Sequence, residues 1–129
     1  MEKLKEKYLE STKNKYDFII GQQGYGKTIY TITKLLMKLE FNVSSVGFQY
    51  WVVALINYRK NYYKYNNTIE KVYFDIAEEF HTTRDRVERA MRTACEPAKN
   101  NISNTFEYNK KLTNKAILKL LTHNVCIIK

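Results

Sequence analysis

Arginine and carboxylate side chains recur at helical spacing within residues 72–94, which read VYFDIAEEFHTTRDRVERAMRTA. The segment is predicted to form two short helices joined by a tight turn. The second helix has a charged side, with i, i+3, i+4, i+7 spacing, that consists of Asp85, Glu88, Arg89 and Arg92. Arginine can donate to both O6 and N7 of guanine, and glutamate can accept from N4 of cytosine. These side chains therefore have the chemistry needed to read bases in a DNA major groove.

The opposite side of the second helix is apolar, which allows the helix to pack on the rest of the protein. Its predicted buried stripe is Val87, Ala90, Met91 and Ala94. Thr82 is predicted to be the N-cap, with Asp85 three residues later as in a capping box. In the preceding helix the small Ala77 permits close crossing of two helices. The pair is therefore predicted to be a helix-turn-helix, in which one helix braces and the other enters the groove.

Composition limits the class of protein. The chain has 129 residues, of which 44% are hydrophobic, so one domain with a real core is expected. The net charge of +9 indicates a polyanionic partner, most commonly nucleic acid, and a solvated basic surface is the alternative. No apolar run is long enough to span a membrane, and the charged start is not a signal peptide. Cys95 and Cys126 form no CxxC pair, so no metal site is expected and both thiols are interpreted as reduced.

The remaining pattern predicts an all-α domain. Residues 1–27 are interpreted as an N-terminal extension or linker, with a short strand at 16–20, and residues 28–129 as the helix-turn-helix domain. Apolar stripes predict helices over 28–40, from Gly47 to about Tyr63, and over 113–122. Pro97 must end or kink the second helix of the motif. The apolar tail 125–128 is expected to pack or to form a short strand. The sum is a six-helix bundle.

Five blocks of sequence together resemble a known family. They read, in order, ITKLLMKLEF, GFQYW, KVYFDIAEEFHTTRDRVERAMR, ISNTFEY and LTNKAIL. From about Ile32 onward the chain is similar to the C-terminal DNA-binding domain of the sporulation response regulator Spo0A. The third block is the most specific, and the resemblance covers roughly three-quarters of the chain. About thirty residues precede it, too few for a receiver domain, so a stand-alone, receiver-less relative from a plasmid, phage or other mobile element is expected.

The resemblance implies six helices, of which the fourth enters the major groove, and binding to short DNA boxes as adjacent copies. Transferred by position, the base-reading residues on helix 83–96 are Glu88, Arg89 and Arg92. The residues implied to lie near the DNA backbone are Thr82, Thr83, Arg84 and Arg86.

A second motif precedes the first predicted helix. Residues 21–28 read GQQGYGKT, which matches the phosphate-loop pattern GxxxxGK[ST]. In such a loop Lys27 would reach the terminal phosphates and Thr28 would hold magnesium. A phosphate-loop enzyme also needs a parallel sheet and an acidic magnesium ligand, and the helical pattern after Thr28 opposes both. A flexible glycine linker is the simplest interpretation, and an anion-binding loop at Gly26, Lys27 and Thr28 is the alternative.

The leading hypothesis is a sequence-specific double-stranded DNA-binding protein of the bacterial cytoplasm, associated with the nucleoid or a plasmid. It would act in transcription regulation or as an accessory factor, as a homodimer or as adjacent copies on DNA. No Ser-His-Asp, Cys-His or paired-carboxylate arrangement is present, so no catalysis, cofactor or small-molecule substrate is expected. The alternatives are a receiver-less antagonist or partner of a sporulation-type regulator, and a nucleotide-binding protein that uses residues 21–28.

Overall fold

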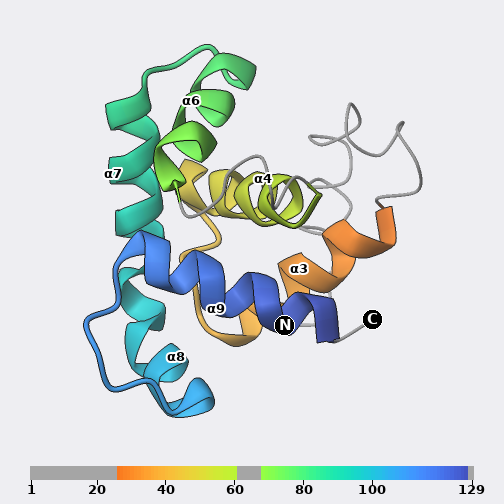
Figure 1. Ribbon diagram of the computed structural model, residues 1–129, viewed down its shortest axis with the longest axis vertical. Coiled ribbons are helices and arrows are strands. Elements are labelled where there is room, and N and C mark those ends of the chain that lie inside the picture. The colour runs from red at the N-terminus through yellow and green to blue at the C-terminus, as the bar shows by residue number, and fades with distance from the viewer. Residues whose placement is uncertain (1–25, 61–67, 128–129) are drawn as a thin grey trace.

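A computed structural model describes residues 26–60 and 68–127, which are helical apart from turns and connecting segments. Its elements are α3 (Gly26–Lys38), α4 (Val46–Lys60), α6 (Ile69–Glu79), α7 (Arg84–Cys95), the 3-10 turn η1 (Glu96–Ala98), α8 (Lys99–Phe106) and α9 (Asn114–Ile127) (Figure 1). The all-α class is confirmed for this part of the chain. The strand expected at 16–20 and most of the glycine loop lie outside the described residues. The helix count of the whole chain stays a prediction.

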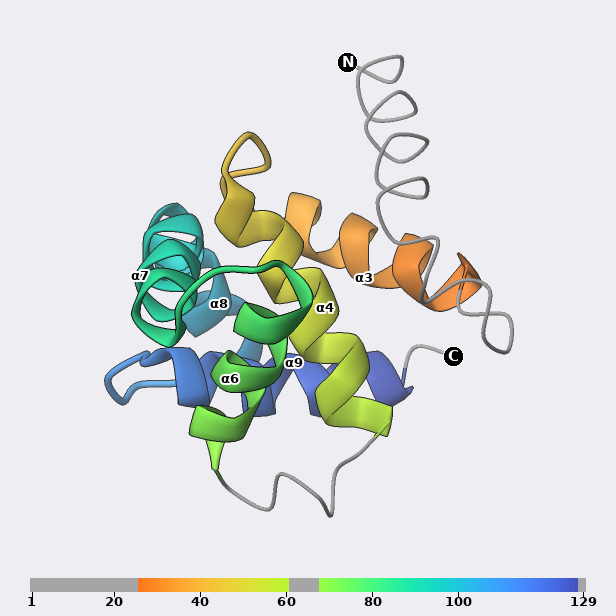
Figure 2. The ribbon, with the colours of Figure 1, turned by 90° about the horizontal axis from the view of Figure 1, so that it is seen from above.

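The central element is α4, which lies between α3 on one side and the α6–α7 pair on the other (Figure 2). It is apolar around most of its circumference, as is typical of a helix enclosed by protein. Its buried positions include Phe48, Trp51, Val52, Val53, Ala54, Leu55 and Ile56. Because α3, α6, α7 and α9 all pack on α4, this helix positions the others.

A tight turn connects α6 to α7. His81 has left-handed backbone geometry with φ of 54°, and the Thr82 N–H donates to the Ala77 carbonyl at 2.9 Å. This is the Schellman pattern of a helix C-terminus, in which a left-handed residue closes the last turn. The ends of α3 and α8 have the same geometry at Glu40 and Glu107. The turn reverses the chain within a few residues, so that α7 packs against α6.

The predicted N-cap of the second helix is wrong by one residue. The cap is Thr83, whose side-chain oxygen accepts from the Arg86 N–H at 3.3 Å. Thr82 belongs to the turn that closes α6, since its N–H donates to the Ala77 carbonyl, and the next helix begins after Thr83. The capping box with Asp85 is therefore absent, because Arg86 occupies the position three residues after the cap.

The end of α7 and the C-terminal part of α9 can be compared with the sequence-based expectations. Pro97 ends α7 as expected: the helix stops at Cys95, the chain makes the turn η1, and α8 begins at Lys99. Of the two alternatives for residues 125–128, packing or a short strand, the strand is wrong within the described residues, because α9 continues to Ile127. Neither proline nor glycine follows Thr113, so nothing in the sequence interrupts that helix.

Helices α4 and α7 approach each other closely at Gly47, near the start of α4. A Cβ atom at this position would lie 2.0 Å from the carbonyl oxygen of Ala90 and 2.8 Å from the Cβ of Ala94, both on α7. One turn further along α4, the indole Nε1–H of Trp51 donates to the Met91 carbonyl at 2.8 Å. Only glycine permits this short distance between the backbones of α4 and α7. The Trp51 hydrogen bond then fixes both the position of α7 along its axis and its rotation about that axis.

We expect Gly47→Ala to destabilise the protein, because overpacking a well-packed core usually costs about 1–3 kcal/mol. Alanine favours the helix over glycine by about 1 kcal/mol, and the net loss of stability is the clash energy minus this gain. Chemical denaturation measures the effect, and Val46→Ala, at the exposed neighbouring position, should change stability by less than about 0.5 kcal/mol. A Gly47→Ala variant as stable as the parent would refute the close crossing.

Candidate nucleic-acid interface

The outer face of α7 is charged and open to solvent. Arg86, Arg89 and Arg92 are exposed, whereas Val87 and Met91 on the inner face are completely buried. The helix lies at the edge of the molecule, with its inner side against α4 and α6 (Figure 1). The helix thus has the amphipathic division that its residue spacing predicts, and its guanidinium groups are accessible to a partner.

Two of the predicted base-reading residues pair with each other. Arg92 Nη1 lies 3.3 Å from Glu88 Oε1, one helical turn apart, with side-chain exposures of 57% and 24%. An exposed pair at this spacing contributes only about 0.3–0.5 kcal/mol, so DNA can replace it at low cost. Within the described part of the chain, no hydrogen bond or ion pair involves the guanidinium of Arg89 or Arg86. These two side chains keep all their donors available.

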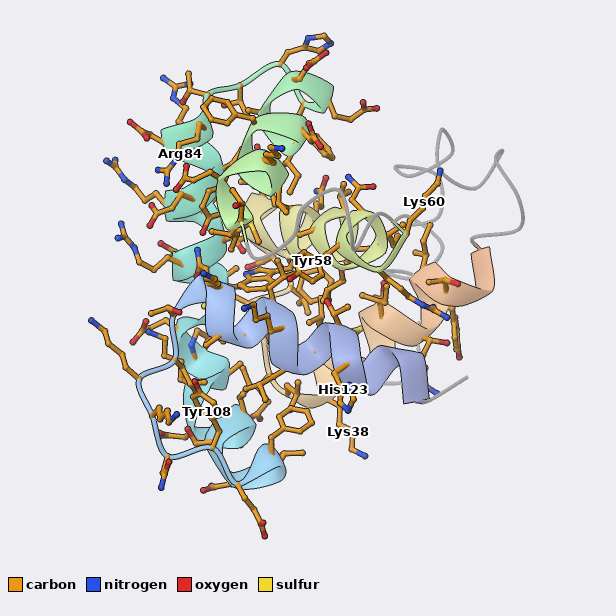
Figure 3. The ribbon with its side chains drawn as sticks, in the orientation of Figure 1. Lys38, Tyr58, Lys60, Arg84, Tyr108 and His123 are labelled. Atoms are coloured by element: carbon orange, nitrogen blue, oxygen red, sulfur yellow. The ribbon has the colours of Figure 1, made fainter. Side chains whose placement is uncertain are left out.

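Arg84 has a different environment from the other arginines of α7. Its Nε donates to Glu70 Oε2 at 2.7 Å and its Nη2 to Glu70 Oε1 at 2.5 Å, and its guanidinium carbon lies 4.9 Å from the centre of the Tyr73 ring. This bidentate pair joins the start of α7, where Arg84 is labelled in Figure 3, to Glu70 at the start of α6. The hydrogen bonds lower the pKa of the Glu70 carboxyl and raise the pKa of Arg84. A phosphate contact by Arg84 stays a prediction, and it would have to compete with Glu70.

The turn residues lie at the same end of the motif as Arg84 and Arg86. Thr82 is half-buried and Thr83 is exposed. The Thr83 oxygen accepts the capping bond, and its hydroxyl hydrogen is still able to donate to an anion. The N-terminal turn of a helix also attracts phosphate through its free N–H groups and its dipole. The structure therefore brings the four predicted backbone-contacting residues together at one end of α7.

A buried polar connection between three helices was missed by the sequence analysis. The side-chain amide of Asn114, at the start of α9, donates to the Tyr73 hydroxyl at 3.0 Å and to the Glu88 carbonyl at 3.3 Å. Its Oδ1 accepts a weak bond from the Cys95 thiol at 3.7 Å. Thr113 caps α9 by accepting from the Ala116 N–H at 3.2 Å, so the side chain of Asn114 is not needed as the cap and points into the core. The backbone of α7 is thus held at Glu88 by α9, in addition to its contacts with α4 and α6.

Cys95 is buried at the end of α7, and burial raises the pKa of its thiol to about 11. A thiol reacts as its thiolate, so this side chain is a poor nucleophile in the folded protein. Its contacts with the Arg92 carbonyl and with Asn114 indicate a packing role.

The described residues of the phosphate-loop match, 26–28, lie far from this surface. Gly26, Lys27 and Thr28 form the first turn of α3, and Thr28 lies close to the C-terminal end of α4. The contacts between α4 and α7 are at the opposite end of α4, near Gly47. The structure therefore does not bring residues 26–28 together with the predicted DNA-contacting residues.

In residues 26–60 and 68–127, no group of three or more His, Cys, Asp or Glu residues is placed to hold a metal ion. Over the same ranges, none of the helices combines the length and the apolar character needed to cross a membrane.

An all-helical domain that exposes an arginine-rich helix beside a tight turn is typical of DNA-binding effector domains. The family model described as "Sporulation initiation factor Spo0A C terminal" matches residues 32–125, from within α3 to within α9. The chain belongs to this family, and it therefore contains a DNA-binding effector domain. Neither the comparison with curated proteins nor the comparison with solved structures gave a match.

The Glu70–Arg84 pair makes stability depend on pH. A carboxyl whose pKa is lowered by folding stabilises the folded state above its ordinary pKa of 4.5, and this contribution is lost as pH falls through the lowered value. We therefore expect the melting temperature of the parent to fall more steeply than that of Glu70→Gln between about pH 5 and pH 3. Glu79→Gln, on the same helix, is the control and should follow the parent. Parallel curves for parent and Glu70→Gln would contradict the pairing.

Proposed function

We propose that this protein binds double-stranded DNA in a sequence-specific manner and reads the major groove with α7 and its caps, residues 83–96. In this proposal α6 and α7 act as a helix-turn-helix: α6 braces and α7 recognises. The observation that supports it best is the division of α7 into an exposed arginine face and an inner face held by α4, α6 and α9. The process served is transcription regulation or another DNA transaction in the bacterial cytoplasm, without catalysis or a cofactor.

The base contacts are assigned to three side chains of α7. Arg89 and Arg92 have the geometry to donate to O6 and N7 of guanine, and Glu88 can accept from N4 of cytosine. Each correct bidentate contact discriminates against a wrong base by about 1–3 kcal/mol. The ion pair between Glu88 and Arg92 shows that both side chains lie on the same face of α7, and because the pair is weak they can separate onto two bases.

Backbone contacts are assigned to Thr82, Thr83, Arg84 and Arg86. Arg86 is exposed and the two threonines lie at the start of α7, where a helix attracts phosphate. Contacts of this kind set the position of a recognition helix but contribute no sequence preference of their own. Binding as a homodimer or as adjacent copies belongs to the same proposal, since repeated short sites are typically read by repeated modules.

We expect Arg89→Ala and Arg92→Ala to weaken binding to the cognate site by about 1–3 kcal/mol each and to relax base preference at the contacted position. The cognate site is first obtained by selection from a random duplex pool, and affinities are then measured for that site and for single-base variants. Lys34→Ala, an exposed change on α3, is the matched control and should leave both quantities unchanged. Circular dichroism must show that each variant is folded.

Arg86→Ala tests the backbone assignment separately. It should weaken all duplexes to a similar extent and reduce the slope of log affinity against log salt by about 1, because one fewer counterion is released. Folded Arg89→Ala and Arg92→Ala variants that bind cognate and random duplexes as the parent does would overturn the base-reading proposal. A change of base preference in Arg86→Ala would overturn the backbone assignment alone.

A further inference from the structure

A cavity of about 240 Å³ lies between the N-terminal end of α3 and the C-terminal end of α4. Among the described residues, its lining consists of Thr28, Ile56, Arg59 and Lys60. The polar part of this described lining is a hydroxyl, a guanidinium and an ammonium group, without a carboxylate. Such a composition is suited to an anion, and above all to a phosphate, whose oxygens accept several hydrogen bonds.

The charged residues in the sequences of the two helices around the cavity are all basic. The sequence of α3 contains Lys27, Lys34 and Lys38, that of α4 contains Arg59 and Lys60, and neither helix contains an aspartate or a glutamate. By contrast, α6 contains Glu70, Asp75, Glu78 and Glu79. A low-dielectric wall with charges of one sign attracts ligands of the opposite sign.

Arg59 is a half-buried cation in the wall of the cavity. Its side chain is half-buried, and in the described ranges no acidic group pairs with it. A guanidinium has five N–H donors and no acceptor, and removing it from water without a partner is unfavourable. The adjacent Ile56 is almost completely buried, so one wall of the cavity is apolar and strengthens any charge-assisted bond made there.

The cavity also gives a structural context to the GxxxxGKT match. The last three residues of the pattern, 26–28, form the first turn of α3, and the hydroxyl-bearing Thr28 is in the cavity wall. In phosphate loops the same residue types begin a helix and bind phosphate there. Here Arg59 and Lys60, more than thirty residues away in sequence, add cations at the same place.

The cavity and the α7 surface are on different sides of the molecule. Gly47, which contacts α7, and Lys60, which lines the cavity, are 13 residues apart on one helix, a separation of about 20 Å at 1.5 Å per residue. Lys60 and Arg84 accordingly lie on opposite sides in Figure 3. A phosphate held in the cavity is therefore not one of those next to the bases that α7 would read.

We propose that this cavity binds a phosphate group, held by the Thr28 hydroxyl, the Arg59 guanidinium and the Lys60 ammonium. Two sources have the required chemistry: a small ligand such as a nucleoside polyphosphate, and the backbone of a DNA segment that passes this side of the protein. The distance from α7 favours the small ligand. The site does not depend on the base-reading proposal, because no residue is shared between the two.

Isothermal titration of the whole chain distinguishes the two sources. The probes are inorganic phosphate, ATP and a duplex of random sequence, and the proteins are the parent, Arg59→Gln, Lys60→Gln and the control Lys34→Gln. We expect ATP and phosphate to bind the parent and Arg59→Gln to weaken ATP binding at least about tenfold, the loss typical of one charge-assisted hydrogen bond. Lys34→Gln, an exposed change on α3 outside the cavity, should match the parent within about twofold.

Each other outcome has a definite meaning. Absence of ATP and phosphate binding to the parent, together with unchanged duplex affinity in the cavity variants, overturns the site. Weaker duplex binding in the cavity variants without any binding of ATP or phosphate rejects the small ligand and assigns the site to DNA. Should Arg59→Gln unfold, the exposed Lys60→Gln decides: equal ATP affinity in Lys60→Gln and parent contradicts the proposal. If the cavity variants keep the base preference of the parent, their effect on ligand binding is independent of base recognition by α7.

Discussion

The close crossing of α4 and α7 at Gly47 is the constraint on which the rest of the structure depends. The missing side chain lets the backbone of α7 approach until a Cβ would be 2.0 Å from the Ala90 carbonyl, and the buried Trp51 then donates to Met91 from the next turn. An alternative, looser crossing would leave a cavity beside Trp51 and an unsatisfied indole N–H, each of which costs about 1–3 kcal/mol. The orientation of α7 is therefore set by its packing on α4, because a looser crossing of these two helices would lose this packing.

The two faces of α7 differ in the strength of their interactions. The inner face is held from three sides, by Trp51 of α4, by the turn from α6, and by the Asn114 amide of α9, which donates to the Glu88 carbonyl. The outer face has exposed ion pairs, such as Glu88–Arg92 and Arg84–Asp85, which are weak and easily exchanged. A rigid backbone with adaptable side chains is suited to reading base edges, because the contacts form without reordering the helix.

Sequence periodicity was sufficient to locate α7 and to separate its faces, since the positions of Val87, Met91 and the arginines follow directly from helical spacing. It failed where one residue has two candidate roles: Thr82 and Thr83 are chemically equivalent caps, and only the Schellman turn at His81 decides between them. Contacts across the fold, such as Arg84 with Glu70 and Asn114 with Tyr73, leave no periodic signal. The cavity beside Arg59 likewise depends on how α3 meets α4, which no local pattern contains.

The central claim is that α7 enters the major groove with its arginines on the base edges. Guanine N7 lies in that groove, so methylation of N7 by dimethyl sulfate reports directly on its occupation. On the selected cognate site, bound protein should protect specific guanines from methylation, and prior methylation of the same guanines should block binding. Full methylation of every guanine in a saturated complex, or protection of minor-groove positions alone, would contradict this account of the protein.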